Sequence, residues 1–94
     1  MSDLTSVRII VYGYVQGVLF RNFVLRRARE LELVGYVRNM PSGAAVEVQA
    51  EGEKERLEKL MEQLKIGPPR AEVEQVEASW SKYSDSYSYF NIRY

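Results

Sequence analysis

The stretch from Gly13 to Arg21 joins two segments with different hydrophobic periods, and this change constrains the fold more than any other feature. Before it, residues 6–13 place Val, Ile and Val at alternate positions, which is typical of a strand. After it, apolar residues recur at helical spacing and predict a helix over residues 21–32. A strand that enters a helix through a glycine loop exposes consecutive backbone N–H groups beside the positive end of the helix dipole. The stretch therefore predicts an anion site, most simply a phosphate cradle, to which Arg21 adds a fixed charge and a planar fork of donors.

The loop matches neither of two common phosphate motifs. It has no Gly-Lys-Ser/Thr, so it is not the loop of a P-loop nucleotide hydrolase. It has no Gly-x-Gly-x-x-Gly, so it is not a dinucleotide fingerprint. From spacing alone, a tight turn followed by a solvated arginine remains an alternative to the phosphate site.

The rest of the chain continues the succession of strand and helix patterns. Further strands are predicted at residues 34–39, 44–51, 72–82 and 89–94, a second helix at residues 53–66, and a loose tail at residues 1–5. The turn Met40-Pro41-Ser42-Gly43 predicts a hairpin between the second and third strands. In the third strand the alternation predicts a wet face made of Glu47, Gln49 and Glu51. Val73 falls on the opposite parity from Val76, which predicts a bulge near Glu74.

This order of elements, β-α-β-β-α-β with a short final strand, is the split β-α-β pattern. It predicts an α+β fold of two layers, in which an antiparallel sheet carries both helices on one face. The strands at residues 7–13 and 44–51 are expected to lie side by side. With 94 residues the chain fits a single domain, residues 1–94.

Cysteine and histidine are both absent from the sequence. Their absence rules out a disulfide framework, zinc sites built from Cys or His, and nucleophiles of the Ser-His or Cys-His kind. A cysteine-based phosphatase loop would lack its nucleophile. If the chain cleaves a phosphate bond, direct attack by water is the simplest option.

The charge balance and the apolar runs bear on partners and location. The formal net charge is zero, so the general attraction that nucleic-acid binders use is missing, and no nucleic-acid partner is expected. No apolar run is long enough to span a bilayer, and residues 1–6 show no signal pattern, so a cytoplasmic location without a membrane partner is expected.

Three strings resemble the acylphosphatase family. They are Val15-Gln16-Gly17-Val18-x-Phe20-Arg21 after Gly13, then Gly35-Tyr36-Val37-Arg38-Asn39, and the closing Phe90-Asn91-Ile92-Arg93-Tyr94. The resemblance extends from about residue 7 to residue 94. It implies a ferredoxin-like two-layer sandwich. It also implies a metal-independent hydrolysis, without a cofactor, of the carboxyl–phosphate bond of a small-molecule acyl phosphate. A monomer is expected.

The resemblance also implies roles for individual residues. Arg21 would bind the phosphate, and Asn39 would orient the attacking water. The backbone cradle would be formed by Gln16, Gly17, Val18, Leu19 and Phe20. Leu19 stands where the family varies and often has a small residue, and we interpret it as a change at the rim of the loop. An asparagine can hold the water but is too weak a base to remove its proton. Holding the water in place is sufficient only if the leaving group is good, as a carboxylate is.

Two alternatives belong to other functional classes. One is a non-catalytic phosphate or acyl-phosphate binding module built on the same cradle, although such a module would not need Asn39. The other is an RNA-binding sandwich of the RRM type, which shares the order of elements. Residues 45–51 lack the aromatic Lys/Arg-Gly-Phe-x-Phe pattern of that class.

Overall fold

The computed structural model describes residues 3–94 and follows the predicted order of elements. The elements are β1 (Leu4–Tyr14), α1 (Phe20–Glu30), β2 (Val34–Asn39), β3 (Ala45–Glu53), α2 (Lys54–Ile66), β4 (Glu72–Lys82) and β5 (Phe90–Arg93). Each bound lies within two residues of the one that the sequence predicts. Neither helix in the described part of the chain is long and apolar enough to cross a bilayer.

The loose tail predicted for residues 1–5 is wrong from Asp3 onward. The carbonyl oxygen of Asp3 accepts a hydrogen bond from the backbone N–H of Lys54 at 2.9 Å, and Leu4 lies opposite Glu53 in the β1–β3 ladder. These residues are ordered because the end of β3 and the start of α2 offer backbone partners. Residues 1–2 lie outside the described part of the chain.

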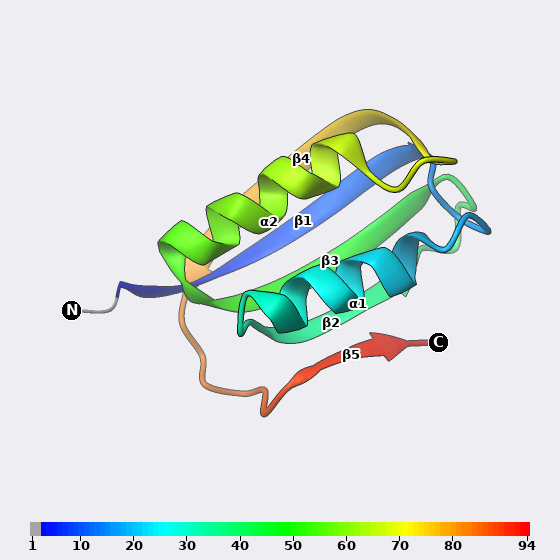
Figure 1. Ribbon diagram of the computed structural model, residues 1–94. Coiled ribbons are helices and arrows are strands. Elements are labelled where there is room, and N and C mark those ends of the chain that lie inside the picture. The colour runs from blue at the N-terminus through cyan, green and yellow to red at the C-terminus, as the bar shows by residue number, and fades with distance from the viewer. Residues whose placement is uncertain (1–2) are drawn as a thin grey trace.

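The sheet has the strand order β4-β1-β3-β2-β5, and both helices cover one of its faces (Figure 1). This is the ferredoxin-like α+β sandwich that the sequence predicts, with β1 beside β3. The four longer strands pair in antiparallel fashion, but β5 pairs in parallel with β2, so the sheet is mixed where an antiparallel one was expected. The reason is the connection over residues 83–89, which carries the chain from β4 to the opposite edge of the sheet (Figure 1).

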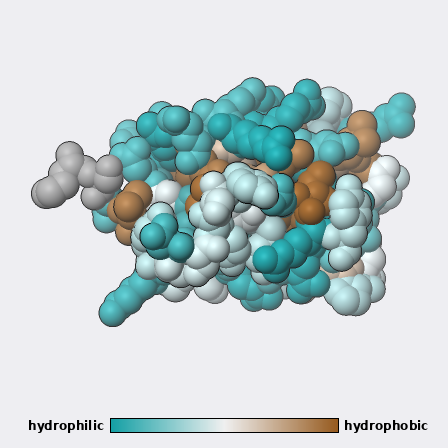
Figure 2. All heavy atoms as spheres, turned by 90° about the horizontal axis from the view of Figure 1, so that it is seen from below, coloured by the Kyte–Doolittle hydropathy of each residue, from teal (hydrophilic) through white to brown (hydrophobic). Residues whose placement is uncertain are grey.

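The core lies between the sheet and the two helices. Its fully buried side chains come from every element except β4 and include Val7, Ile9, Val24, Val37, Val48, Leu57, Leu60 and Phe90. Viewed from the side of β5, the surface over the 83–89 connection is mostly of intermediate hydropathy (Figure 2), as its Tyr and Ser content implies.

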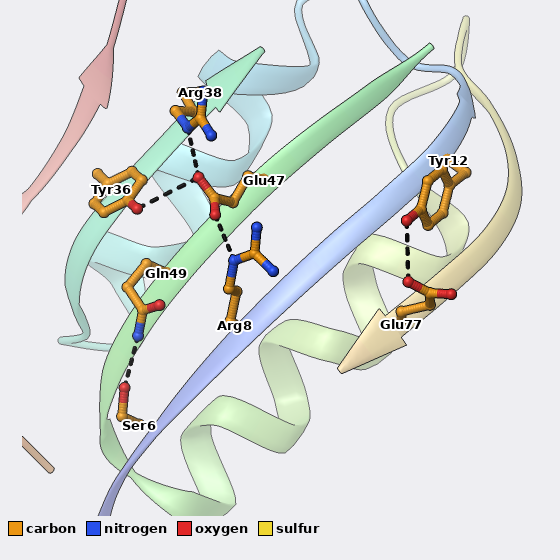
Figure 3. Close-up of polar contacts among 8 residues, drawn as sticks. All are labelled: Ser6, Arg8, Tyr12, Tyr36, Arg38, Glu47, Gln49 and Glu77. Atoms are coloured by element: carbon orange, nitrogen blue, oxygen red, sulfur yellow. Dashed lines mark hydrogen bonds and ion pairs between the residues drawn. The ribbon is translucent and has the colours of Figure 1, made fainter. Parts of the chain in front are cut away.

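The wet face predicted for β3 is buried instead at two of its three positions. Glu47 is 3% exposed and Glu51 is 2% exposed. Glu47 accepts hydrogen bonds from Arg8 of β1 and from Arg38 and Tyr36 of β2, which reach across the strand from both sides (Figure 3). The alternation within β3 is therefore correct, but long side chains of the flanking strands cover the face away from the helices.

Glu51 is covered by a different part of the chain. Its carboxylate accepts hydrogen bonds from the backbone N–H and the hydroxyl of Ser84 and from the backbone N–H of Asp85. The polar segment between β4 and β5 is thus attached to the sheet through a buried carboxylate. That attachment fixes the path that leads to β5.

The predicted bulge near Glu74 is confirmed. In the β1–β4 ladder Tyr12 lies opposite Gln75 and Gly13 lies opposite Val73, so Glu74 has no partner on β1. A Cβ at Gly13 would lie 2.1 Å from the carbonyl oxygen of Glu72, so only glycine fits here. The bulge and this glycine set the point at which β1 leaves the sheet and enters the loop before α1.

Candidate active site

A cavity of about 190 Å³ opens where β1 and β2 end and α1 begins. Its lining residues are Val15, Gly17, Leu19, Phe20, Arg21, Asn22, Asn39, Ile92 and Tyr94. The fold thus brings Arg21 and Asn39, which are 18 positions apart in the sequence, to one small cavity. None of these lining residues, all from the described part of the chain, has an acidic side chain, so the surroundings of the cavity favour an anion.

The loop before α1 turns through two residues with positive φ. Gly17 has φ +73°, and Leu19, the residue that precedes the helix, has φ 61° and ψ 24°. The left-handed conformation of Leu19 costs about 1 kcal/mol relative to an ordinary one. A Cβ at Gly17 would meet no heavy atom within 4 Å, so the space in front of this backbone is open.

The backbone N–H groups of this loop are available as donors. Within residues 3–94, no hydrogen-bond acceptor is found for the N–H groups of residues 16–20. The loop is held largely by side chains, because Val15, Val18 and Phe20 are buried in the core. A loop that is anchored by its side chains and leaves its N–H groups free can present them to an anion at the start of a helix.

Not every residue predicted for the cradle lines the cavity. Gly17, Leu19 and Phe20 do, whereas Gln16 and Val18 do not. Val18 is 7% exposed and packs into the core. The side chain of Leu19 is 74% exposed at the rim, in keeping with the interpretation of this position from the sequence.

Arg21 lies in the first turn of α1 and is half-buried. Its Cζ atom lies 4.9 Å from the centroid of the Tyr94 ring. Within the described residues Arg21 takes part in no salt bridge, whereas Arg8, Arg27, Arg38 and Arg56 do. Its positive charge is therefore not neutralised by a neighbouring carboxylate.

Asn39 is the last residue of β2, opposite Val46 of β3. Its side-chain oxygen Oδ1 is buried and has no hydrogen-bond partner among the described residues. A buried acceptor without a partner costs about 1 to 3 kcal/mol, so such atoms usually have a reason to be retained. Here the reason can be a donor brought by a water or a ligand in the cavity that Asn39 lines.

Sequence reasoning missed three contributors to this region. Asn22, Ile92 and Tyr94 line the cavity, the last two because the parallel β5 runs to the same end of the sheet as β2. It also missed the side chain of Gln16, whose Nε2 donates to the carbonyl oxygens of Met40 and Ala45, both at 2.9 Å. The only signal for Ile92 and Tyr94 was their place in the closing string, and no local pattern pointed to the contacts of Gln16.

Comparison with known proteins identifies the relatives of this chain. Residues 7–92 match the family model for acylphosphatase, which confirms the resemblance seen in the sequence. A relative described as acylphosphatase from Dehalococcoides mccartyi (strain CBDB1) is 49% identical over 88 residues, which are 94% of this chain and 97% of the relative. Among solved structures, an acylphosphatase from Bacillus subtilis has a TM-score of 0.91 at 38% identity and covers 98% of this chain and 100% of its own. One from Coxiella burnetii has a TM-score of 0.90 at 41% identity, covering 97% of this chain and 94% of its own.

Proposed function

The chain belongs to the acylphosphatase family of hydrolases that act on acid anhydrides, and from this premise we propose that Arg21 and Asn39 act together on a small acyl phosphate. The observation that carries the proposal is the shared cavity. Its lining includes an arginine that has no carboxylate partner and an asparagine whose buried amide oxygen has no hydrogen-bond partner, both within the described residues. These are the two groups that a bound phosphate and a bound water require.

The phosphate group is held by the loop and the helix start. Oxygens of the phosphate accept hydrogen bonds from the backbone N–H groups of residues 16–20 and from the guanidinium fork of Arg21. These donors are already fixed before the substrate arrives, so they need little reorganisation when charge develops on the phosphoryl oxygens. Each donor of this kind contributes about 3 kcal/mol to lowering a barrier in enzymes that use such sites.

Asn39 holds the attacking water. Its Oδ1 accepts a hydrogen bond from the water, and this directs a lone pair of the water oxygen toward phosphorus. The new bond forms between the water oxygen and phosphorus, while the bond between phosphorus and the bridging acyl oxygen breaks. The electron pair of that bond leaves with the carboxylate, and a proton of the water passes to a phosphate oxygen. The products are a carboxylate and inorganic phosphate.

This route needs neither a strong base nor a general acid from the protein. A carboxylate is a stable anion at neutral pH, since carboxyl groups have pKa values of about 4, so it leaves without being protonated. That fits a sequence without histidine and a cavity for which the described structure gives no acidic lining residue. The proposal therefore specifies turnover without a metal ion or a cofactor. We also propose that the protein is a monomer and acts in the cytoplasm, as expected from the sequence.

Replacement of Arg21 tests the phosphate half of the proposal. In the presence of excess chelator, Arg21→Ala is expected to lose measurable turnover of a synthetic acyl phosphate and to lose inhibition by inorganic phosphate. The matched control is Arg26→Ala, an exposed arginine of α1 outside the cavity, for which both properties stay within about twofold of wild type. Phosphate inhibition of Arg21→Ala at the wild-type concentration would contradict the role of this arginine.

A further inference from the structure

The side chain of Gln16 joins the loop before α1 to the hairpin between β2 and β3. Its Nε2 group donates one hydrogen bond to the carbonyl oxygen of Met40 and a second to the carbonyl oxygen of Ala45, each at 2.9 Å. Met40 and Ala45 are themselves paired, because the N–H of Met40 donates to Ala45 at 3.0 Å. Both hydrogens of one side-chain amide are thus used at the point where the hairpin leaves the sheet.

This link connects the two halves of the site. Gln16 precedes Gly17 in the loop, and Met40 directly follows Asn39 at the end of β2. A second contact lies nearby, where the backbone N–H of Gly13 donates to Ala44 at 3.0 Å. Between Gly13 and α1, the hydrogen bonds of Gln16 are the polar contacts that tie the loop to the hairpin within the described residues.

We propose that Gln16 is a positioning residue, which sets the distance between the phosphate cradle and Asn39 through its two hydrogen bonds to the hairpin. This rests on the proposed function, because it assumes that phosphate is bound on one side of the link and water on the other. The loop alone can bind phosphate, since Arg21 and the free N–H groups lie on the helix side. In-line attack, however, requires the water and the phosphorus to be aligned, and displacements of about 1 Å can cost about 100-fold in rate.

A double-mutant cycle with Asn39 tests whether Gln16 acts through it. Gln16→Met keeps the length of the side chain and removes both donors. It is expected to lower kcat about 10- to 100-fold while inhibition by inorganic phosphate changes by less than about threefold. In the Asn39→Ala background the same change is expected to cost less than about threefold, because the residue that Gln16 positions is already absent.

The pH dependence of Gln16→Glu gives a second readout that a general loss of stability would not produce. At neutral pH the ionised carboxylate has no donor and faces two carbonyl oxygens, so kcat falls as in Gln16→Met. When the carboxyl group is protonated it donates one hydrogen bond. The kcat of Gln16→Glu, divided by that of the wild type at the same pH, is therefore expected to rise at least about threefold as the pH is lowered from 7 to 4.5. The corresponding ratio for Gln16→Met stays flat.

A matched control separates positioning from the ordinary loss of a hydrogen bond. Gln49 of β3 also uses its Nε2 as a donor, to Ser6 at 2.7 Å, on the sheet face away from the helices (Figure 3). Gln49→Met should leave kcat and phosphate inhibition within about twofold of wild type.

The outcomes distinguish the two proposals. Equal losses for Gln16→Met in the wild-type and Asn39→Ala backgrounds would overturn the positioning role and leave the proposed function intact. The positioning role would also be overturned if Gln16→Met lowered only the melting temperature, or if Gln49→Met lowered kcat as much as Gln16→Met does. Wild-type turnover by Asn39→Ala alone would overturn the water-holding role of Asn39, and the inference about Gln16 with it.

Discussion

Arg38 of β2 donates a hydrogen bond from its Nε to the buried carboxylate of Glu47 on β3. Arg8 of β1 donates to the other oxygen of the same carboxylate (Figure 3). Three neighbouring strands are therefore joined by one side chain on the face away from the helices. Asn39 follows Arg38 in the chain, so this contact also helps to fix the end of β2 that carries the candidate site.

Glu47→Gln is expected to destabilise the protein. It keeps the shape of the side chain but leaves two half-exposed arginines without their carboxylate, and we expect a loss of about 1 to 3 kcal/mol in the free energy of unfolding. Urea denaturation measures this. Glu77→Gln, which alters an exposed carboxylate that accepts from Tyr12 at 3.0 Å, serves as control and should change stability by less than about 0.5 kcal/mol. Equal effects of the two substitutions would contradict the account of Glu47.

The carboxylate of Glu47 should also make the stability of the protein depend on pH. Burial acts to raise the pKa of Glu47, but the hydrogen bonds and charges of Arg38 and Arg8 outweigh it and hold the pKa below its ordinary value. A carboxyl group with a lowered pKa in the folded state contributes stability above its unfolded pKa and loses that contribution as the pH falls through the folded one. Below about pH 4 the unfolding free energy of the wild type should therefore fall more steeply than that of Glu47→Gln. Parallel curves from urea titrations at pH 7, 5 and 3 would show that Glu47 does not carry this effect.

Gly17→Ala tests whether the open space in front of the loop is where phosphate binds. Its φ of +73° implies a cost of about 1 kcal/mol in stability, and the added methyl group would enter the space that the phosphate needs. We expect inhibition by inorganic phosphate to weaken at least about 10-fold. Gly43→Ala is matched to it, with φ +81°, nothing within 4 Å of the new methyl group and a place in the hairpin turn. Gly43→Ala should show the same loss of stability and unchanged inhibition, and a similar loss of inhibition in both variants would refute the cradle.

The rate of hydrolysis is expected to vary little with pH near neutrality. Neither an arginine nor an asparagine titrates there, and the sequence has no histidine. A profile of kcat between pH 6 and pH 8 should be flat within about twofold. A steep change in that range would mean that another titrating group takes part.

The sequence was sufficient to predict most of the fold, because the hydrophobic period marks each element and Gly13 marks where the first strand gives way to the loop. Even the bulge at Glu74 follows from the parity of Val73. The predictions that failed depended on contacts between residues far apart in the sequence. The burial of Glu47 comes partly from Arg8, 39 positions away, and the parallel direction of β5 comes from where residues 83–89 cross the sheet.

The residues of the candidate site also fall into those that the sequence predicted and those that it missed. Arg21 was predicted from its place at the exit of the glycine loop, and Asn39 from a string that resembles a known family; both line one cavity. The side chain of Gln16 was missed because its two acceptors lie 24 and 29 positions away, where no local pattern reaches. Tyr94 and Ile92 were missed as lining residues because only the parallel pairing of β5 with β2 brings them to the cavity.

The most direct test of the account is the hydrolysis of a synthetic acyl phosphate by the wild type and by Asn39→Ala, with excess chelator present. Asn91→Ala, an exposed asparagine of β5 outside the cavity, is the matched control. We predict that the wild type and Asn91→Ala turn over the substrate at similar rates. Asn39→Ala should lose about 100-fold or more in kcat while inorganic phosphate still inhibits it. Wild-type turnover by Asn39→Ala, or turnover that chelator abolishes, would contradict the proposal that Asn39 orients the attacking water without a metal.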